Sequence, residues 1–299
     1  MHYGTPASME DVMPYYTHIR RGRTPPQDLY DDLVRRYTAI GGPSPLTKIS
    51  EDQAEVIRQG LENRGFLVQL YIGCKHTHPF VAEAVEQMAK DEIDEAVAVV
   101  LAPHYSSYSV ASYKKYAFDA RDTYRPRMQI AMVERWGTMP EFIQALSNRV
   151  NAQLDGLDLD ETLVIFSAHS LPVKIMASGD PYVTELHETS ELVATACHIP
   201  HWTFAFQSAS TTGEPWLGPD ILEVIDREKE HYKNIVSCTV GFVSDHLEVL
   251  YDLGIETRDK CAELGLNFRR CEVLNVDKPC LDALASRLAE LFEKESVAG

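Results

Sequence analysis

A histidine and a glutamate each follow an apolar, strand-like run, and together they could bind a cation and exchange protons. His169 comes directly after the run 162–166, and Glu248 comes shortly after the run 234–243. In open parallel α/β sheets, ligands bind outside the carboxyl ends of the strands. If both runs belong to one sheet, the imidazole and the carboxylate project into the same crevice.

The chemistry open to His169 depends on where its ring points. A histidine at the end of a buried strand can be a satisfied core residue, but the loop 167–172 is short and rich in small residues, so we expect the ring to face the crevice. An imidazole with a pKa near 6.5 exchanges protons around neutral pH. Neutral imidazole is also a good ligand for ferrous iron.

Three carboxylates recur at a spacing of four residues: Glu248, Asp252 and Glu256. On a helix this spacing aligns them along one face, one turn apart. The spacing is typical of a solvated acidic stripe, but stacked like charges also favour a path for a divalent metal ion or for departing protons. His246 lies two residues before Glu248, so on a helix it would face elsewhere, in a structural or supporting role.

Composition excludes several classes of protein. The chain has 299 residues and a formal net charge of −17, which opposes binding to nucleic acids and to anionic membranes. It has no apolar stretch long enough to span a bilayer and no signal peptide, so we expect a cytoplasmic protein. Basic residues cluster at 18–23 and 35–36, where they indicate either an anionic ligand or a solvated helix end.

The six cysteines carry no clear metal-binding pattern. None forms a CxxC pair, and the last three, Cys261, Cys271 and Cys280, are spaced by ten and nine residues. This spacing fits zinc sites poorly, and thiolate clusters usually contain closer pairs. We therefore expect reduced cysteines and no [2Fe-2S] cluster.

Strand-like and helix-like segments alternate along the chain, which is typical of parallel sheets with helices on both faces. The expected strands are 66–72, 96–101, 128–133, 162–166, 202–206, 234–243 and 266–273. The expected helices are 81–90, 109–121, 181–197, 217–232, 245–253 and 281–294. We predict an N-terminal domain over 1–127, a C-terminal domain over 128–280, and a helix at 281–299 that returns to the first domain.

The first half has one strand candidate fewer than the second. By comparison of the two halves, the missing strand should stand immediately before Tyr3, where the chain has no residues to form it. A sheet without a central strand exposes two edges and loses core. The interpretation favoured here is a start placed too far downstream; a first sheet built without this strand is the alternative.

Four motifs in order resemble those of ferrochelatases, over nearly the whole chain. They are Tyr-Gly-Thr-Pro at 3–6 with Tyr-Thr-His-Ile-Arg-Arg-Gly-Arg at 16–23, Ser-Ala-His-Ser-Leu-Pro at 167–172, Gln-Ser at 207–208 with Pro-Trp-Leu-Gly-Pro-Asp at 215–220, and Val-Gly-Phe-Val-Ser-Asp-His-Leu-Glu at 240–248. The chain looks most like the coproporphyrin III ferrochelatases of Gram-positive type bacteria. It lacks the apolar lip of the membrane-bound relatives and the closely spaced C-terminal cysteines that hold a cluster in some of them.

The resemblance implies an α/β fold of two Rossmann-like domains with a porphyrin cleft between them. It implies that His169 and Glu248 bind ferrous iron and handle the pyrrole protons, and that Tyr3 approaches the metal from the opposite face. Asp252 and Glu256 match an outer acidic path for the divalent ion. Porphyrin contacts are implied for a further set of matching positions: Tyr3, Arg20, Arg36, Tyr37, Ser44 and Tyr113.

The expected function is insertion of Fe²⁺ into coproporphyrin III in haem biosynthesis, with iron as a substrate and no resident cofactor. The alternatives are a non-catalytic carrier of a tetrapyrrole or metal on the same scaffold, and a chelatase for another metal or tetrapyrrole. A fold by itself does not decide between them. We expect a monomer that binds neither nucleic acid nor membrane, and a transient partner from the haem pathway is an open possibility.

Overall fold

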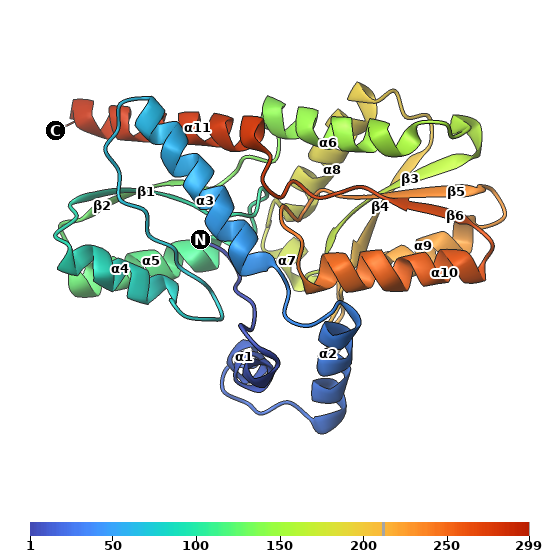
Figure 1. Ribbon diagram of the computed structural model, residues 1–299, viewed down its shortest axis with the longest axis horizontal. Coiled ribbons are helices and arrows are strands. Elements are labelled where there is room, and N and C mark those ends of the chain that lie inside the picture. The colour runs from blue at the N-terminus through green and yellow to red at the C-terminus, as the bar shows by residue number, and fades with distance from the viewer. Residues whose placement is uncertain (211–212, 299) are drawn as a thin grey trace.

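A computed structural model describes residues 1–210 and 213–298, and it has an α/β architecture with two parallel sheets lying side by side (Figure 1). The strands are β1 (Glu95–Val99), β2 (Gln129–Val133), β3 (Thr162–His169), β4 (Trp202–Gln207), β5 (Asn234–Thr239) and β6 (Asn267–Arg270). Strands β1 and β2 form the first sheet, and the second sheet has the order β4-β3-β5-β6. Every strand pair is parallel, as the alternation of strands and helices predicts.

Helices cover both faces of each sheet. They are α1 (Val12–Ile19), α2 (Gln27–Ala39), α3 (Leu46–Asn63), α4 (Val81–Lys90), α5 (Val110–Tyr124), α6 (Pro140–Leu154), α7 (Lys174–Ala177), α8 (Tyr182–Ala196), α9 (Ile221–Glu228), α10 (Thr257–Glu263) and α11 (Lys278–Ala298), with the short turns η1 (Met9–Asp11) and η2 (Leu159–Glu161) and the π-helix η3 (Val249–Glu256). In Figure 1, α11 lies above the first sheet with α3 crossing in front, and α4 and α5 lie below the sheet. Helices α6 and α8 lie above the second sheet, and α9 and α10 lie below it. The expected fold class is confirmed.

The second sheet supplies most of the core because its central strand is covered on both faces. All residues of β3 from Thr162 to Ala168 are buried, which explains why its sequence is a continuous apolar run and does not alternate. Its odd and even residues enter two different apolar clusters: Val164 and Phe166 pack toward α6 and α8, and Leu163 and Ile165 pack toward α9. The strand is therefore a rigid support for the residue at its carboxyl end.

The first sheet is smaller than the sequence predicts. Within the described chain, residues 66–72 form no strand, and their Leu67 is 99% exposed. The first residues of the chain lie between this segment and β1: His2 N donates to Gly73 O (3.1 Å), and Leu101 N donates to Met1 O (2.9 Å). They thus make a short parallel connection at the carboxyl end of the first sheet.

Strand pairing assigns residues near the expected domain boundary to the first sheet. The register of β1 with β2 runs from Glu95 opposite Gln129 to Val99 opposite Val133. Strand β2, which the predicted division assigns to the second domain, thus pairs with β1 of the first sheet. The division into 1–127 and 128–280 as folding units stays a prediction.

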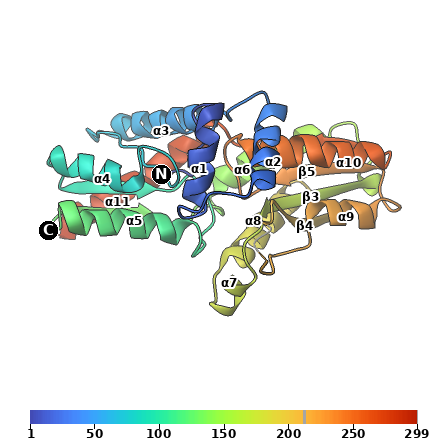
Figure 2. The same ribbon diagram turned by 90° about the horizontal axis from the view of Figure 1, so that it is seen from below.

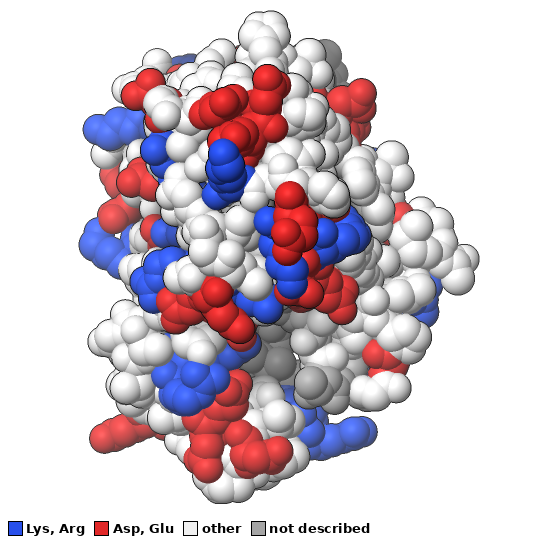
Figure 3. Space-filling view, turned by 90° about the vertical axis from the view of Figure 1, so that its right-hand side faces the viewer, with Lys and Arg blue, Asp and Glu red and all other residues white. Residues whose placement is uncertain are grey.

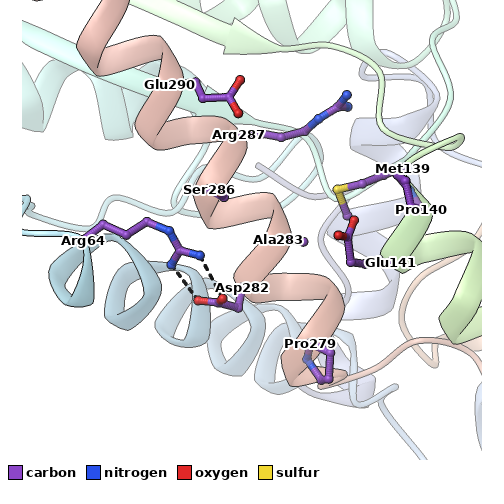
Figure 4. Close-up of a pocket in the computed structure, with 10 residues that line it drawn as sticks. All are labelled: Arg64, Met139, Pro140, Glu141, Pro279, Asp282, Ala283, Ser286, Arg287 and Glu290. Atoms are coloured by element: carbon purple, nitrogen blue, oxygen red, sulfur yellow. Dashed lines mark hydrogen bonds and ion pairs between the residues drawn. The ribbon is translucent and has the colours of Figure 1, made fainter.

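The C-terminal helix returns to the first half of the chain, as its spacing predicts. Helix α11 packs on α3 and on both strands of the first sheet, and also on α6 (Figure 1). Figure 4 shows the groove of about 530 Å³ where α3, α6 and α11 meet, with Arg64 donating to both carboxylate oxygens of Asp282 (2.7 and 2.9 Å). The last residue of the predicted segment 281–299, Gly299, lies outside the described residues.

Helices α1 and α2 form an arm that lies across the junction of the two halves, as Figure 2 shows from below. Helix α2 contacts η3, where Arg36 pairs with Asp252 (Nη1 to Oδ1, 3.3 Å). The arm thereby connects the N-terminal part of the chain with the segment that follows Glu248. Among residues 1–210 and 213–298, we find no helix with both the length and the apolar character that crossing a membrane requires.

Candidate active site

The loop after β3 fixes the orientation of the His169 ring. His169 is the last residue of the strand, and its backbone pairs with Gln207 of β4. Its Nδ1 lies in very close contact with the carbonyl oxygen of Ser170, which can only accept a hydrogen bond, so Nδ1 carries the proton. The other ring nitrogen, Nε2, is therefore the atom presented to the site.

Glu248 meets this nitrogen. Its Oε1 lies 3.4 Å from His169 Nε2, and both side chains are about 30% exposed (30% for His169 and 28% for Glu248). Glu248 stands at the start of η3, after the loop that follows β5, and β5 pairs directly with β3. The sequence-based expectation that the two side chains share one crevice is thus confirmed in its geometry.

Each partner of the pair shifts the pKa of the other. Burial acts to lower the pKa of His169, but the negative charge of Glu248, with its hydrogen bond and that of Ser170, raises it to about 9. Burial acts to raise the pKa of Glu248, but the charge and hydrogen bond of His169, helped by His246, hold it well below its usual range. Near neutral pH the pair is an imidazolium and a carboxylate, and a metal ion must displace the proton to reach Nε2.

A second histidine supports the same carboxylate. His246 Nδ1 donates to Ser244 O (2.9 Å), and its Nε2 lies 3.6 Å from the other carboxylate oxygen of Glu248. The sequence predicts a helix from residue 245 onward, and on that helix the His246 ring would point away from Glu248. Residues 240–246 are a loop, and the chain turns His246 and Glu248 toward each other.

Behind Glu248, the carboxylates continue along a π-helix and not along the expected α-helix. Asp252 is buried, forms an ion pair with Arg36 and accepts a very short hydrogen bond from Ser208 Oγ, while Glu256 is exposed. Burial raises the pKa of Asp252 to about 6, against the lowering effect of Arg36. The three carboxylates thus run from the cavity through the interior to the surface.

The His169–Glu248 pair lies on the wall of a large cavity. Its volume is about 1110 Å³, above the usual range for small-ligand sites, which is roughly 300–1,000 Å³. Six residues predicted for the site line this cavity: Tyr3, Tyr37, Ser44, Tyr113, His169 and Glu248. Four other residues predicted for the site are not part of the cavity lining that the structure describes: Arg20, Arg36, Asp252 and Glu256. Arg20 lies instead over the ring of Tyr16, 5.8 Å from its centroid, and Arg21 lines the cavity.

Tyr3 lines the cavity, and the backbone of the neighbouring segment 75–76 holds it there. Lys75 N donates to His2 O and His76 N donates to Tyr3 O, each at 3.0 Å. The Tyr3 ring lies 4.5 Å from the His76 ring between centroids, and it is 43% exposed. A partly exposed phenol on the cavity wall can contact a bound ligand.

The remaining predicted contacts form a polar wall. Thr5 Oγ1 hydrogen-bonds Ser44 Oγ (2.9 Å) and lies 3.4 Å from the hydroxyl of Tyr37, whose pKa burial raises to about 12. Tyr113 is almost fully buried and lies under the ammonium group of Lys75, 5.5 Å from the ring centroid. Hydroxyl groups that stay protonated can donate to an anionic ligand.

Sequence reasoning missed Lys75 as a site residue. Its ammonium group donates to Tyr108 O (2.8 Å), lines the cavity, and has its pKa lowered to about 8 by burial. The available signal was its position directly after the apolar run 66–72, beside His76. Within the part of the chain that the structure describes, no group of three or more His, Cys, Asp or Glu side chains is arranged to hold a metal ion.

Solved structures with a similar fold are chelatases. SirB from Bacillus subtilis with Fe³⁺ matches with a TM-score of 0.58 and 15% identity, covering 81% of this chain and 89% of that one. A cobalt complex of the sirohydrochlorin chelatase SirB matches with a TM-score of 0.56 and 14% identity, covering 81% and 88% of the two chains. At these identities the likeness shows a chelatase-like fold and nothing finer.

The family is shown by sequence. The family model described as Ferrochelatase matches residues 1–291, so the chain belongs to the ferrochelatase family. A coproporphyrin III ferrochelatase of Halalkalibacterium halodurans is 46% identical, covering 99% of this chain and 97% of its own length. Proteins of the same name from Oceanobacillus iheyensis and Geobacillus thermodenitrificans are 43% and 42% identical, each aligned with 99% of this chain and with 96% and 95% of their own lengths.

Proposed function

We propose that this protein inserts ferrous iron into coproporphyrin III and so makes an iron porphyrin for haem biosynthesis. The observation that carries the proposal is the His169–Glu248 pair, 3.4 Å apart on the wall of a cavity of about 1110 Å³. Membership of the ferrochelatase family and the names of full-length relatives at 42–46% identity support the choice of reaction and of substrate.

The reaction exchanges one Fe²⁺ for the two N–H protons of the porphyrin. A planar macrocycle shields its nitrogens, whereas a cavity that binds the ring bent exposes their lone pairs, so binding energy away from the nitrogens lowers the barrier. Iron binding at Nε2 of His169 releases the proton that the resting pair holds. After iron passes to the porphyrin, the freed pair can accept one of the two pyrrole protons, since the raised pKa of His169 favours its protonated form, and the other proton leaves to solvent water.

We propose Asp252 and Glu256 as the outward continuation of this site, and Tyr3 as the group that approaches the metal from the other face. Glu248 lines the cavity, Asp252 is buried and Glu256 is exposed, and this arrangement supports a route for a hydrated cation or for leaving protons. Arg36 lies beside Asp252 and limits the local negative charge.

The porphyrin carboxylates require cations and hydroxyl donors, and charge-assisted hydrogen bonds are the strongest of these contacts. The cavity wall includes Tyr37, Ser44 and Tyr113, and this position supports their proposed role in binding the porphyrin ring. Arg20 and Arg36 remain proposed contacts for the carboxylates, although neither lines the cavity as described. The cavity-facing Lys75 and Arg21 extend the proposed cationic set.

We propose that catalysis needs no resident cofactor, that the protein works as a cytoplasmic monomer, and that a transient partner takes the product. The separation of the C-terminal cysteines supports the absence of a [2Fe-2S] cluster. Cys261 is packed in the cluster below the second sheet, and Cys271 and Cys280 are packed in the cluster above it. Sedimentation of the purified protein tests the monomer.

The test is an anaerobic insertion assay with Fe²⁺ and coproporphyrin III, followed by the Soret absorption of the product. We expect repeated turnover, with more product than enzyme. Tight porphyrin binding without metallation would favour the alternative of a carrier. A competition among Fe²⁺, Co²⁺ and Zn²⁺, each with coproporphyrin and with sirohydrochlorin, would reveal a chelatase for another metal or tetrapyrrole.

A further inference from the structure

Gln53 is a fully buried polar residue on α3, outside the cavity wall, and the proposed mechanism does not use it. Its side chain is 0% exposed, whereas its neighbours on the buried face of α3 include the apolar Ile57 and Leu61. Burying an amide costs free energy unless its hydrogen bonds are made. The contacts of Gln53 therefore indicate what its burial serves.

Every polar atom of this amide has a partner in the loop 240–246 or at Asn275. Gln53 Nε2 donates to Val243 O (3.0 Å) and to Asn275 O (2.8 Å), and its Oε1 accepts from Ser244 Oγ (3.1 Å). The two carbonyls need a donor and the hydroxyl can supply a proton, so only this orientation of the amide satisfies all three. Gln53 thus connects α3 to two loops of the second half.

Asn275 fixes the same loop from the other side. Its backbone N donates to Val243 O (2.9 Å), its Oδ1 accepts from Asp245 N (2.9 Å), and its Nδ2 donates to Asp245 Oδ2 (2.8 Å). Together, Gln53 and Asn275 hold the backbone from Val243 to Asp245, a stretch that belongs to no helix or strand. A loop with this many buried bonds has one preferred conformation.

The fixed loop leads directly to the catalytic carboxylate. Ser244 donates to Gln53 through its hydroxyl, and its carbonyl accepts from His246 Nδ1 (2.9 Å). His246 Nε2 lies 3.6 Å from Glu248, which lies 3.4 Å from His169. A continuous series of polar contacts therefore runs from α3 to the pair that we propose to bind iron.

We infer that Gln53 is a positioning residue for iron insertion: through Ser244 it holds the loop that orients His246 and Glu248 toward His169. The inference rests on the proposed function. Gln53 itself does not line the cavity, whereas Val243 and Ser244, which it contacts, do, so Gln53 acts on the site through this loop. Partners that orient metal ligands typically matter by about 10- to 100-fold in metal affinity or activity.

The test substitutes Gln53→Met, which keeps the length of the side chain and removes all three hydrogen bonds. We expect kcat to fall and the KM for Fe²⁺ to rise, for a combined loss of about 10-fold or more in kcat/KM for iron. The dissociation constant for coproporphyrin III, measured by fluorescence quenching without metal, should stay unchanged. Ser244→Ala removes one of the three bonds and should change the same two iron parameters by less.

Ile57→Ala is the matched control, because it destabilises the same helix from the next turn and makes none of these polar contacts. We expect it to lower the melting temperature while leaving kcat and the KM for iron as in the wild type. In the double variant of Gln53→Met and Ser244→Ala, the effects on kcat/KM should be less than additive, because both act on one contact.

The results separate the possible failures. If Gln53→Met loses stability as Ile57→Ala does but keeps the wild-type kcat and iron KM, Gln53 is structural only and the inference is wrong. If Gln53→Met does not fold, Ser244→Ala decides: unchanged iron parameters in that variant overturn the inference. If the wild type itself turns over no iron, the proposed function fails first, and the insertion assay shows this independently.

Discussion

At the scale of single residues, the site depends on two histidine rings, each of which donates a hydrogen bond from one nitrogen to a backbone carbonyl. His169 donates through Nδ1 to Ser170 and His246 donates through Nδ1 to Ser244, so both Nε2 atoms face the carboxylate of Glu248. A backbone carbonyl is a fixed acceptor, and such partners set the tautomer and direction of metal-binding histidines. The two Nε2 atoms and the Glu248 carboxylate therefore lie together as groups that could contact a cation.

The first prediction concerns pH. The pKa of His169 is raised to about 9, so between pH 6 and pH 8 the ring holds a proton that Fe²⁺ must displace. One displaced proton makes the KM for iron fall about tenfold for each unit of rising pH over this range. Anaerobic initial rates at pH 6, 7 and 8 measure this, with the porphyrin KM as the internal comparison. An iron KM that does not change with pH would contradict the assigned protonation state.

A second prediction concerns Asp252, whose pKa is raised to about 6. The folded state binds its proton more tightly than the unfolded state does, so the carboxyl group contributes stability at low pH that is lost as pH rises from about 4 through 6. Asp252→Asn has no carboxyl group to ionise at this position, so it does not lose this stability as pH rises. In the variant, Arg36 keeps its ion pair with Asp32 (3.3 Å). We expect the variant to be as stable as the wild type or more stable at pH 7.5, by up to about 2 kcal/mol, and to insert iron more slowly.

Urea unfolding at pH 4.5 and pH 7.5 measures this difference in the free energy of unfolding. Glu256→Gln is the control, because Glu256 is exposed and its substitution should leave stability within about 0.5 kcal/mol. A marked loss of stability in Asp252→Asn at pH 7.5 would show that the ion pair with Arg36 stabilises the folded state more than burial of the carboxylate destabilises it.

Site residues that stand at the ends of strands could be placed from the sequence. Site residues whose positions depend on the conformation of a loop could not. His169 and Glu248 meet because β3 and β5 are paired neighbours. The apolar runs predict the two strands, and their place in one sheet was an assumption that the structure confirms. The position of His246 depends on the conformation of 240–246, for which no periodic pattern exists. Arg36 was assigned to the ligand by resemblance, whereas its nearest described partners are Asp32 and Asp252.

At the scale of elements, the same contrast holds. The apolar runs predicted β1 to β6, and the spacing predicted α4 with its observed bounds. The run 66–72 has strand composition but forms no strand, since a strand requires a hydrogen-bonding neighbour along its length. Helix α6 was not predicted, although Phe142, Leu146 and Val150 recur on its buried face and Pro140 begins it.

A third prediction concerns the crossing of α3 and α11. A methyl group on Gly60 would lie 2.7 Å from Ala285 Cβ and 2.9 Å from Asp282 Oδ1, so Gly60→Ala forces the helices apart. Overpacking costs about 1–3 kcal/mol, which exceeds the helix-propensity gain of about 1 kcal/mol. Urea unfolding should show a net loss for Gly60→Ala and recovery in the double variant with Ala285→Gly. The exposed Gln59→Ala is the control, and a stabilised Gly60→Ala would contradict the close packing.

At the scale of the whole molecule, a net charge of −17 surrounds a cavity that carries cations. On the face shown in Figure 3, acidic and basic side chains are interspersed and form no single uniform patch. The overall field attracts a divalent cation and repels a porphyrin that carries several carboxylates. Cations placed in the cavity, such as Lys75, compensate for this repulsion only at short range.

A fourth prediction follows for ionic strength. Raising it from 0.02 M to 0.3 M screens the long-range field, so we expect the KM for Fe²⁺ to rise by about two- to fivefold and the KM for coproporphyrin III to stay level or fall. Opposite responses of the two substrates are the signature, because a general effect of salt on folding would move both in one direction. A parallel rise in both KM values would contradict the prediction.

The most direct test of the central claim compares porphyrin binding with iron insertion in His169→Ala. We expect a coproporphyrin dissociation constant close to that of the wild type and an insertion rate reduced to background. His187→Ala, an exposed histidine on α8 outside the cavity, should match the wild type in both measurements. Iron insertion by His169→Ala at the wild-type rate would contradict the role assigned to the His169–Glu248 pair.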